Sequence, residues 1–425
     1  MRLVACAVSF PSALRPRYHP TKPSRGGPMS DFFDIKDREF QEHPHAVYKR
    51  LIAECPVHHS EKYGFYAVSR YQDVKEILRN TGLWSSKFGP GTAYADPEAP
   101  NALVNVDPPE HDFQLKLVNK AFTRQSINAL EPDITEFVRN KVAEIRPRGH
   151  ADLMQDFAVH LPLFVISRML GVDPADGPMF RGWVQELTMG VFGDGDPAVI
   201  QGVQAEFAAY FTNEVQKREK VLAEGGTLED DLITRLLTAE VDGKRLEPAR
   251  VLGFISFLLV AGSGTTTMLV CNTVHHLLEN PDQMAKVMAN FDLIPPALEE
   301  SMRYTAPVHG LFRTNNEDVT LHGVNIPKDS KVMCMFAAAN LDADQFADPD
   351  RFDVERSAAE LRKQLGFGWG THICTGAPLA RMEARIALTE ILSGLPNLRA
   401  DGPAVQTAPS VLYGFDSLPV AWDAE

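Results

Sequence analysis

Residues 365–383 read LGFGWGTHICTGAPLARME, and this stretch decides how the rest of the chain is interpreted. Four glycines surround one cysteine, Cys374, and the segment from residue 377 onward has the composition of a helix. A cysteine at the entry of a helix lies near free backbone N–H groups, which favour the thiolate. The simpler alternative is a glycine-rich turn whose cysteine is only a small buried apolar residue.

The spacing of this stretch is more specific than its composition. It resembles the haem-binding signature of the cytochrome P450 family, carried here by Phe367, Gly368, Gly370, His372, Cys374, Gly376, Leu379, Ala380 and Arg381. The resemblance implies that Cys374 is the axial thiolate of a haem b iron and that Phe367, Gly368 and Gly376 hold the cofactor. Thiolate ligation favours O–O bond cleavage, so O2 is the implied co-substrate.

Composition limits the alternatives. The chain has 425 residues and a net charge of −14, although its first 28 residues carry five Arg and Lys and no acid. An acidic body is a poor partner for nucleic acid, which selects basic surfaces. Five cysteines without paired spacing indicate a reducing compartment, so we expect a cytoplasmic protein. We expect residues 1–28 to be a disordered or upstream extension, and residues 29–425 to form one catalytic domain.

The pattern of apolar residues is mainly helical, with strand-like segments near both ends. Residues 247–278 predict a helix of about 32 residues, which at 1.5 Å per residue crosses a whole domain. Glycines and hydroxyl residues interrupt its apolar run, so we expect a buried helix and no membrane insertion. The predicted fold class is mainly α with small β-sheets. The resemblance implies the cytochrome P450 fold, with this long central helix over the haem.

The middle of the long helix reads Ala261-Gly-Ser-Gly264-Thr265-Thr266. Glycines and consecutive hydroxyls weaken a helix, either for close packing or for a local opening. The family resemblance implies an oxygen-binding groove here, with Ala261 against the haem and a catalytic role for Gly264, Thr265 and Thr266. Thr265 matches the threonine that assists oxygen. Gly264 stands where the family commonly has Asp or Glu, so a water, Ser263 or a substrate group would have to relay protons.

Glu300 and Arg303 lie one helical turn apart and by themselves predict only an ordinary ion pair. In context they resemble the family's Glu-x-x-Arg motif, and Arg351 resembles its third partner. The implied role is structural: a buried charge network that fixes the segment before the cysteine.

The two propionates of haem need cationic or hydrogen-bonding partners. His372 and Arg313 match usual partners of the family, and His111 matches the histidine of a His-x-x-x-Arg pattern. Here Leu115 replaces that arginine, and Lys116 is one residue too late to face the same way on a helix.

The sequence offers no source of the two electrons that oxygen activation needs. It has no Gly-x-Gly-x-x-Gly between strand and helix and no ferredoxin-like cysteine spacing. We therefore expect electrons from NAD(P)H to arrive through a ferredoxin and a ferredoxin reductase. Basic residues flank segments near the cysteine face and form either a docking patch or a solvated cluster: Lys116, Lys120, Arg124, Arg362 and Lys363.

Family position also predicts the substrate pocket, although core packing explains each of these residues singly. The set is apolar and aromatic, which favours a small or medium apolar substrate such as a terpenoid, an aromatic compound or a fatty acyl chain. Its members are Trp84, Phe88, Tyr94, Leu258, Ala261, Leu311 and Phe312.

The sequence thus predicts a haem-thiolate monooxygenase that inserts one oxygen atom of O2 into an apolar substrate, and we expect a monomer. A peroxide-driven peroxygenase is a second enzyme hypothesis, suggested by Gly264. A haem-based ligand sensor without turnover is an alternative of another class, and a purely structural cysteine loop is a third.

Overall fold

The computed structural model describes residues 32–99, 101–192, 195–408 and 410–424. Residues 1–28, for which the sequence predicts an extension, lie outside the described residues. The α-helices are α1 Arg38–Glu42, α2 Pro44–Glu54, α3 Tyr71–Arg79, α4 Glu110–Ala121, α5 Arg124–Asn128, α6 Glu131–Ile145, α7 His160–Leu170, α8 Gly177–Phe192, α9 Pro197–Ala223, α10 Leu232–Thr238, α11 Pro248–Glu279, α12 Pro281–Ala289, α13 Ile294–Tyr304, α14 Phe336–Ala339, α15 Ala358–Leu361 and α16 Ala377–Gly394.

Short 3-10 and π segments link these helices: η1 Leu103–Asn105, η2 Arg146–Arg148, η3 Leu153–Ala158, η4 Pro174–Asp176, η5 Phe291–Leu293 and η6 Gly370–His372. The strands are short: β1 Val57–Ser60, β2 Phe65–Val68, β3 Trp84–Ser85, β4 His150–Asp152, β5 Glu240–Val241, β6 Lys244–Arg245, β7 Leu311–Asn315, β8 Val319–Leu321, β9 Val324–Ile326, β10 Lys331–Cys334, β11 Arg399–Ala400, β12 Val405–Gln406, β13 Phe415–Ser417 and β14 Pro419–Ala421.

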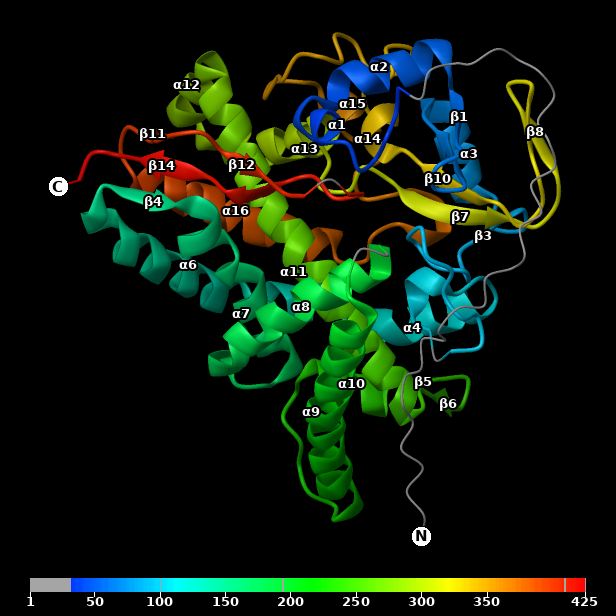
Figure 1. Cartoon of the computed structure of the whole chain (residues 1–425). Helices are drawn as coiled ribbons and strands as arrows, with labels where there is room; N and C mark the ends of the chain where they lie inside the picture. The colour runs from blue at the N-terminus through cyan, green and yellow to red at the C-terminus, as the bar shows by residue number, and fades with distance from the viewer. Residues whose placement is uncertain (1–31, 100, 193–194, 409, 425) are drawn as a thin grey trace.

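The largest described sheet has five strands in the order β1-β2-β10-β7-β3. Strand β10 runs parallel to β2 and antiparallel to β7, so segments distant in sequence meet in one sheet. This sheet lies on one side of the molecule, and helices fill most of the rest (Figure 1). The predicted fold class, mainly α with small sheets, is confirmed.

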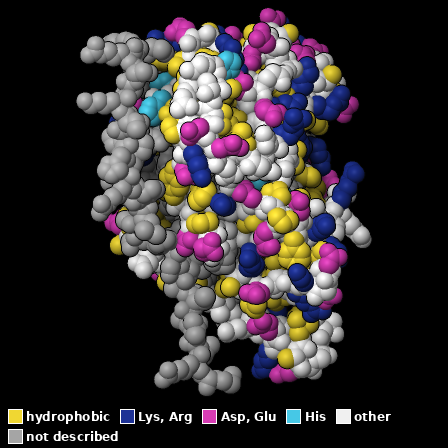
Figure 2. All heavy atoms as spheres, turned by 90° about the vertical axis from the view of Figure 1, so that its right-hand side faces the viewer, with side chains coloured by type: hydrophobic (Ala, Val, Ile, Leu, Met, Phe, Trp, Pro, Cys, Tyr) yellow, Lys and Arg dark blue, Asp and Glu magenta, His cyan; other side chains and the backbone are white. Residues whose placement is uncertain are grey.

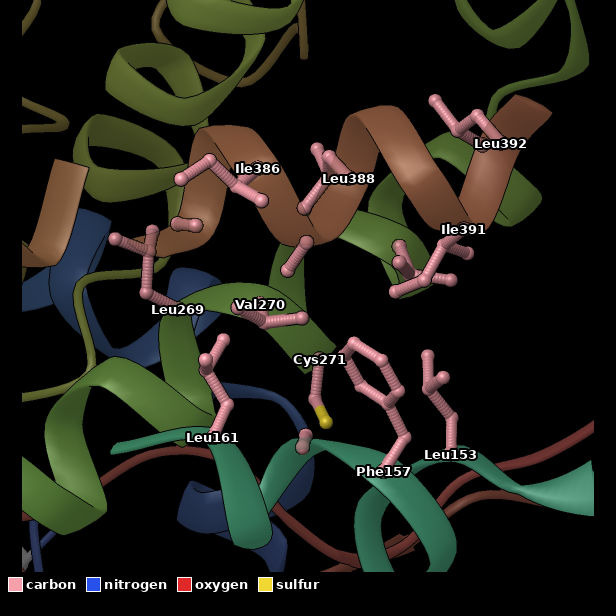
Figure 3. Packing of buried hydrophobic residues seen from close by; sticks show 14 of the residues in the cluster. Leu153, Phe157, Leu161, Leu269, Val270, Cys271, Ile386, Leu388, Ile391 and Leu392 are labelled. Atoms are coloured by element: carbon pink, nitrogen blue, oxygen red, sulfur yellow. The ribbon is translucent and has the colours of Figure 1, made fainter. Parts of the chain in front are cut away.

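Helix α11 forms the axis of the core. It spans 32 residues, as the apolar pattern of residues 247–278 predicts. Leu269, Val270 and Cys271 of α11 pack between η3–α7 on one side and α16 on the other. Figure 3 shows these layers, with Phe157 below α11 and Ile386 above it. Burial of such side chains contributes about 25 cal/mol per Å² of apolar surface, so this contact fixes α16 relative to α11.

The C-terminal segment differs from the prediction. The sequence predicts a hairpin over residues 410–420 with its turn at Tyr413-Gly414. Instead β13 pairs with β12, and β14 pairs with β11 and β4. Gly414 lies against α11, where an added Cβ would be 2.5 Å from Met268 Cγ. This glycine is therefore required for close packing, and local turn propensity does not decide the pairing.

Candidate functional site

The loop before α16 is shaped by glycines that no other residue replaces without strain. Gly368 and Gly370 have φ values of +74° and +72°, which favour glycine. An added Cβ at Gly370 would also lie 2.8 Å from the Leu78 carbonyl oxygen of α3. The Cys374 N–H donates to the Phe367 carbonyl at 2.8 Å, which closes the loop and places the cysteine at the entry of α16.

Cys374 is exposed, unlike the buried Cys271 and Cys334. Its sulfur is nevertheless surrounded by protein atoms, and this burial raises the pKa of the Cys374 thiol. Hydrogen bonds from the backbone N–H groups of Gly376 and Ala377 oppose the rise, as does the positive charge of Arg381. The site therefore supplies donors for a sulfur anion but needs a cation at the sulfur to stabilise it fully.

Three predicted cofactor ligands from distant segments meet beside this loop. The rings of His111 (α4) and His372 (η6) have centroids 4.3 Å apart. Burial, together with Arg313 (β7) and His111, lowers the pKa of His372 to about 2. Arg313 is buried, and burial lowers its pKa. Within the described chain Arg313 forms no ion pair, and it donates one hydrogen bond, at 2.8 Å, to the Phe312 carbonyl. A buried guanidinium without an acid is suited to an anionic ligand.

Two residues that the sequence did not single out orient this cluster. The Ser86 hydroxyl lies 3.1 Å from His372 Nε2. Asp107 accepts hydrogen bonds from the Ser85 hydroxyl at 2.5 Å and the Ser86 N–H at 2.7 Å, which fixes Ser86. Asp107 also acts to raise the pKa of Arg313. The Asp-Pro-Pro-Glu sequence at residues 107–110 signals the start of α4, but nothing in it indicates this contact.

The middle of α11 carries an exposed position inside an otherwise buried helix. Ala261 is exposed, and a Cβ added to Gly264 would meet no atom within 4 Å. The Thr265 hydroxyl, on the same side, donates to the Ala261 carbonyl at 2.7 Å. The helix therefore borders open space at the predicted groove. Thr266 is buried on the packed side of α11, so its position does not support the catalytic role predicted for it.

The buried charge network contains a different arginine from the predicted one. Glu300 accepts two hydrogen bonds from Arg303, at 2.7 and 2.8 Å, and one from Arg356 Nε at 3.0 Å. The side chain of Arg351 is exposed, and only its carbonyl joins the network, accepting from Arg303 and Arg356. The prediction of Arg351 as third partner is wrong because the chain turns after Asp353 and brings Arg356 back over Glu300.

A second ion pair joins α13 to α16, the helix that follows the cysteine loop. Glu299, adjacent to Glu300, accepts from Arg381 Nε at 2.5 Å and from its Nη2 at 3.0 Å. The Arg381 guanidinium also lies 4.3 Å from the centroid of the Phe367 ring. Glu299 thus fixes Arg381 and, through it, Phe367. The sequence places Arg381 in the motif but does not reveal Glu299 as its partner.

The predicted pocket residues do not all remain candidates. Phe312 is 0% exposed and packs its ring 5.2 Å from that of Phe65, so the prediction that it lines the pocket is wrong. Trp84 is also enclosed, in the apolar cluster between the five-stranded sheet and α3. Both face the core because they lie on the covered faces of the sheet. The residues that retain accessible surface are Phe88, Tyr94, Leu258, Ala261 and Leu311.

The donor set fits a haem. A cysteine sulfur with two backbone donors is available for iron, and a buried arginine with two histidines is available for carboxylates. The open space beside Gly264 lies on the helix that the resemblance puts over the cofactor. In the described chain no three or more His, Cys, Asp or Glu side chains gather as a polydentate metal site.

Comparisons with known proteins identify the family. A family model described as cytochrome P450 matches residues 192–395. The chain is 35% identical over 402 residues to cytochrome P450 109 of Bacillus spizizenii, covering 92% of this chain and 94% of that protein. It is 33% identical over 385 residues to the steroid C26-monooxygenase of Mycolicibacterium smegmatis, covering 88% and 92%.

The solved structure of cytochrome P450 CYP109Q5 from Chondromyces apiculatus superposes with a TM-score of 0.84 at 33% identity, covering 92% of this chain and 98% of that one. Fold, motif spacing and whole-length similarity lead to one conclusion. This chain belongs to the cytochrome P450 family, whose members are haem-thiolate monooxygenases.

Proposed function

We propose that this monooxygenase inserts one oxygen atom of O2 into a medium-sized apolar substrate, using electrons from a separate ferredoxin system. The observation that carries the proposal is the pairing of an exposed Cys374, whose sulfur has two backbone donors, with an open groove at Gly264 on α11. The family supplies the reaction class, haem iron and O2. The substrate class and electron source are our inference.

We assign Cys374 as the residue that would ligate the haem iron. Phe367, Gly368 and Gly376 shape its loop, Ala261 would border the cofactor, and His372, Arg313 and His111 would hold the propionates. When bound, a thiolate-ligated haem supplies oxygen activation. The protein residues would do the rest: the two backbone N–H groups would stabilise the sulfur anion, and Arg313, which has no ion-pair partner in the described chain, would neutralise carboxylates.

Thr265 is the proposed proton-relay residue. Its hydroxyl donates to the Ala261 carbonyl, so its oxygen remains free to accept a hydrogen bond from a water in the groove. Gly264 offers no acid, and a Cβ added there would meet no atom within 4 Å. We infer that water in this space, or a polar group of the substrate, delivers the proton that an acid delivers in relatives.

The accessible pocket residues Phe88, Leu258 and Leu311 favour an apolar substrate. The relative from M. smegmatis is named a steroid C26-monooxygenase, so a steroid-sized or terpenoid substrate is our first choice. Fatty acyl chains and aromatic compounds remain in the screen as smaller alternatives.

A ferredoxin is the proposed electron donor. Ile373, next to Cys374, is 52% exposed, which is unusual for a large apolar residue and suits a docking surface. Lys116, Lys120, Arg124 and Arg362 are also exposed. Lys120 donates to the Glu240 carbonyl at 2.5 Å, so it is partly engaged within the chain. A small acidic partner would complement these cations.

We propose a cytoplasmic monomer in which residues 29–425 form one catalytic domain. Two helical stretches, Leu153–Leu170 and Pro248–Glu279, are long and apolar enough to cross a membrane. More than half of each window is buried, which is typical of core helices. Figure 2 shows Lys, Arg, Asp and Glu side chains interspersed over the face that carries β8 and α4, as on a solvated surface.

The test is reconstitution of the purified holoenzyme with a ferredoxin, its reductase and NADPH. Steroids, terpenoids and fatty acids are first screened by the spin-state shift of the ferric haem, and shifting compounds are then incubated and analysed for hydroxylated product. Product that requires the ferredoxin supports the proposal. Spectral shifts without product under any electron supply would instead support a ligand sensor.

Peroxide-driven turnover is the second candidate, and the observation that favours it is the missing acid at Gly264. A groove without a fixed acid controls proton delivery less tightly. This suits hydrogen peroxide, which already carries the two electrons and two protons that O2 would have to receive in the site. Product formation with hydrogen peroxide at a rate equal to or above the ferredoxin-supported rate would favour this candidate.

A further inference from the structure

Lys331 is a buried lysine that the assigned chemistry does not use. It begins β10, is 2% exposed, and lies on the sheet face that also carries Met333 and Phe312. No acid pairs with it anywhere in the described chain. An apolar side chain at this position would avoid the desolvation cost of an ammonium group, so the contacts that Lys331 makes need an explanation.

Those contacts all go to residues 88–94, in the loop between β3 and α4. Lys331 Nζ donates to the Phe88 carbonyl at 2.7 Å and to the Gly89 carbonyl at 2.9 Å. The same nitrogen lies 4.8 Å from the centroid of the Tyr94 ring. The Tyr94 hydroxyl donates to the Asp329 carbonyl at 2.9 Å, two residues before Lys331. The lysine is thus enclosed by two carbonyls and an aromatic ring from one loop segment.

The loop segment is held on two further sides. The Phe312 N–H of β7 donates to the Pro90 carbonyl at 3.0 Å. The Thr92 hydroxyl donates to the Phe192 carbonyl at the end of α8, also at 3.0 Å. Residues 88–94 therefore contact both the five-stranded sheet and the end of α8. They belong to the segment that connects β3 to α4 (Figure 1). Lys331 supplies two of the hydrogen bonds that hold residues 88–94, to the carbonyls of Phe88 and Gly89.

We propose that Lys331 is a positioning residue: it clasps residues 88–94 onto β10 and thereby sets the orientation of Phe88 and controls the entry of bulky ligands. The ring of Phe88 meets that of Tyr94 edge-on at 6.3 Å, so the clasp fixes both rings together. The part concerning ligand entry rests on the proposed function, since Phe88 is assigned there to the substrate pocket. The clasp itself does not depend on that assignment.

The first experiment measures amide hydrogen exchange in the holoenzyme for wild type, Lys331→Met and the control Lys328→Met. Lys328 is exposed on the turn that precedes β10. Loss of the two hydrogen bonds from Nζ predicts exchange at least about tenfold faster over residues 86–95 in Lys331→Met alone. Unchanged exchange over these residues would overturn the proposal. If Lys331→Met does not fold, Lys331→Gln, which keeps a shorter donor, is measured in its place.

The second experiment separates a clasp from general loosening. Association of 4-phenylimidazole and of imidazole with the ferric haem is followed by the Soret shift. A lost clasp speeds association of the bulky ligand several-fold and leaves that of imidazole unchanged. Equal acceleration of both ligands, or of neither, would contradict control of entry. If Lys331→Met shows faster hydrogen exchange but unchanged association of 4-phenylimidazole, the role of Lys331 in holding residues 88–94 is supported. The assignment of Phe88 to the substrate pocket is then rejected.

Discussion

Arg356 Nε lies 3.0 Å from Glu300 Oε2, and both side chains are buried in the network that also holds Arg303. Its guanidinium further donates to the carbonyls of Ala347, Asp348 and Arg351. Arg356 thereby connects α13 to the segment that leads into the cysteine loop. The contact joins residues 56 positions apart.

This geometry separates two arginines that look alike in sequence. We expect Arg356→Leu to destabilise the fold by about 3–5 kcal/mol, because it leaves Glu300 buried with one partner fewer and removes one donor from each of three carbonyls. Arg351→Leu should change stability by less than about 0.5 kcal/mol, since its side chain is exposed and its carbonyl is retained. Urea denaturation and haem content measure both variants. Equal losses in the two would refute the assignment.

Gly264→Asp tests proton delivery. An added Cβ at this position meets nothing within 4 Å, so the first atom of the new side chain is accommodated. We expect a larger fraction of the consumed NADPH to appear as hydroxylated product, because a carboxylate close to Thr265 can relay protons.

The matched control is Gly264→Asn, which fills the same space without an ionisable group. Product and hydrogen peroxide are quantified for each protein. If the Asn variant couples as well as the Asp variant, the gain comes from filling space. If neither exceeds wild type, proton relay at this position does not limit turnover.

Arg313 should govern haem retention. Its guanidinium is buried without an acid, and it helps lower the pKa of His372 to about 2. We expect Arg313→Met to lose haem to apomyoglobin at least about tenfold faster, because a charge-assisted contact to a carboxylate is removed. Arg313→Lys keeps the charge and should lie between the two. Identical transfer rates for wild type and Arg313→Met would argue against a propionate contact.

Lys331 predicts a pH-dependent stability. Burial, with a contribution from Arg313, lowers the pKa of Lys331 from 10.5 to about 7 in the folded protein. Between these two values the unfolded chain binds more protons at this residue than the folded chain does, so its contribution to wild-type stability improves as pH rises. Below pH 7 the full cost of a buried charge applies.

The stability gained by Lys331→Met, relative to wild type, should therefore be largest near about pH 6 and shrink toward about pH 10. Thermal unfolding at several pH values measures the difference, and Lys328→Met corrects for a change in surface charge. A difference between Lys331→Met and wild type that does not vary with pH would show that Lys331 keeps its ordinary pKa.

Local patterns explain which features were predictable. The haem-binding signature lies within one short segment, whose backbone needs glycine at 368 and 370, so the family resemblance and the predicted haem-thiolate site could be read from local sequence. The apolar run of α11 predicted its position to within one residue, because a buried helix needs a continuous apolar surface. Only the family resemblance implied that His111 and His372 serve the same cofactor. Their rings meet because α4 and η6, which are far apart in the sequence, lie side by side in the fold.

The predictions were wrong where the position of a residue in the sequence did not decide which way its side chain points. Arg351 and Arg356 both follow the Asp348-Pro349 turn, and only the folded chain shows which side chain turns inward to Glu300. Phe312 has the composition of a pocket residue, yet strand register directs it into the core against Phe65.

The sequence by itself determined the reaction class and the long helix and predicted Cys374 as the haem ligand, since each depends on residues that are close neighbours in the chain. Tertiary structure alone decided that Glu299 pairs with Arg381, that Arg356 completes the Glu300 network, and that Lys331 holds the loop at Phe88. These contacts join segments 56 to 243 residues apart. The packing of α11, α13, α16 and the five-stranded sheet brings such segments together, and no local propensity encodes which side chains then meet.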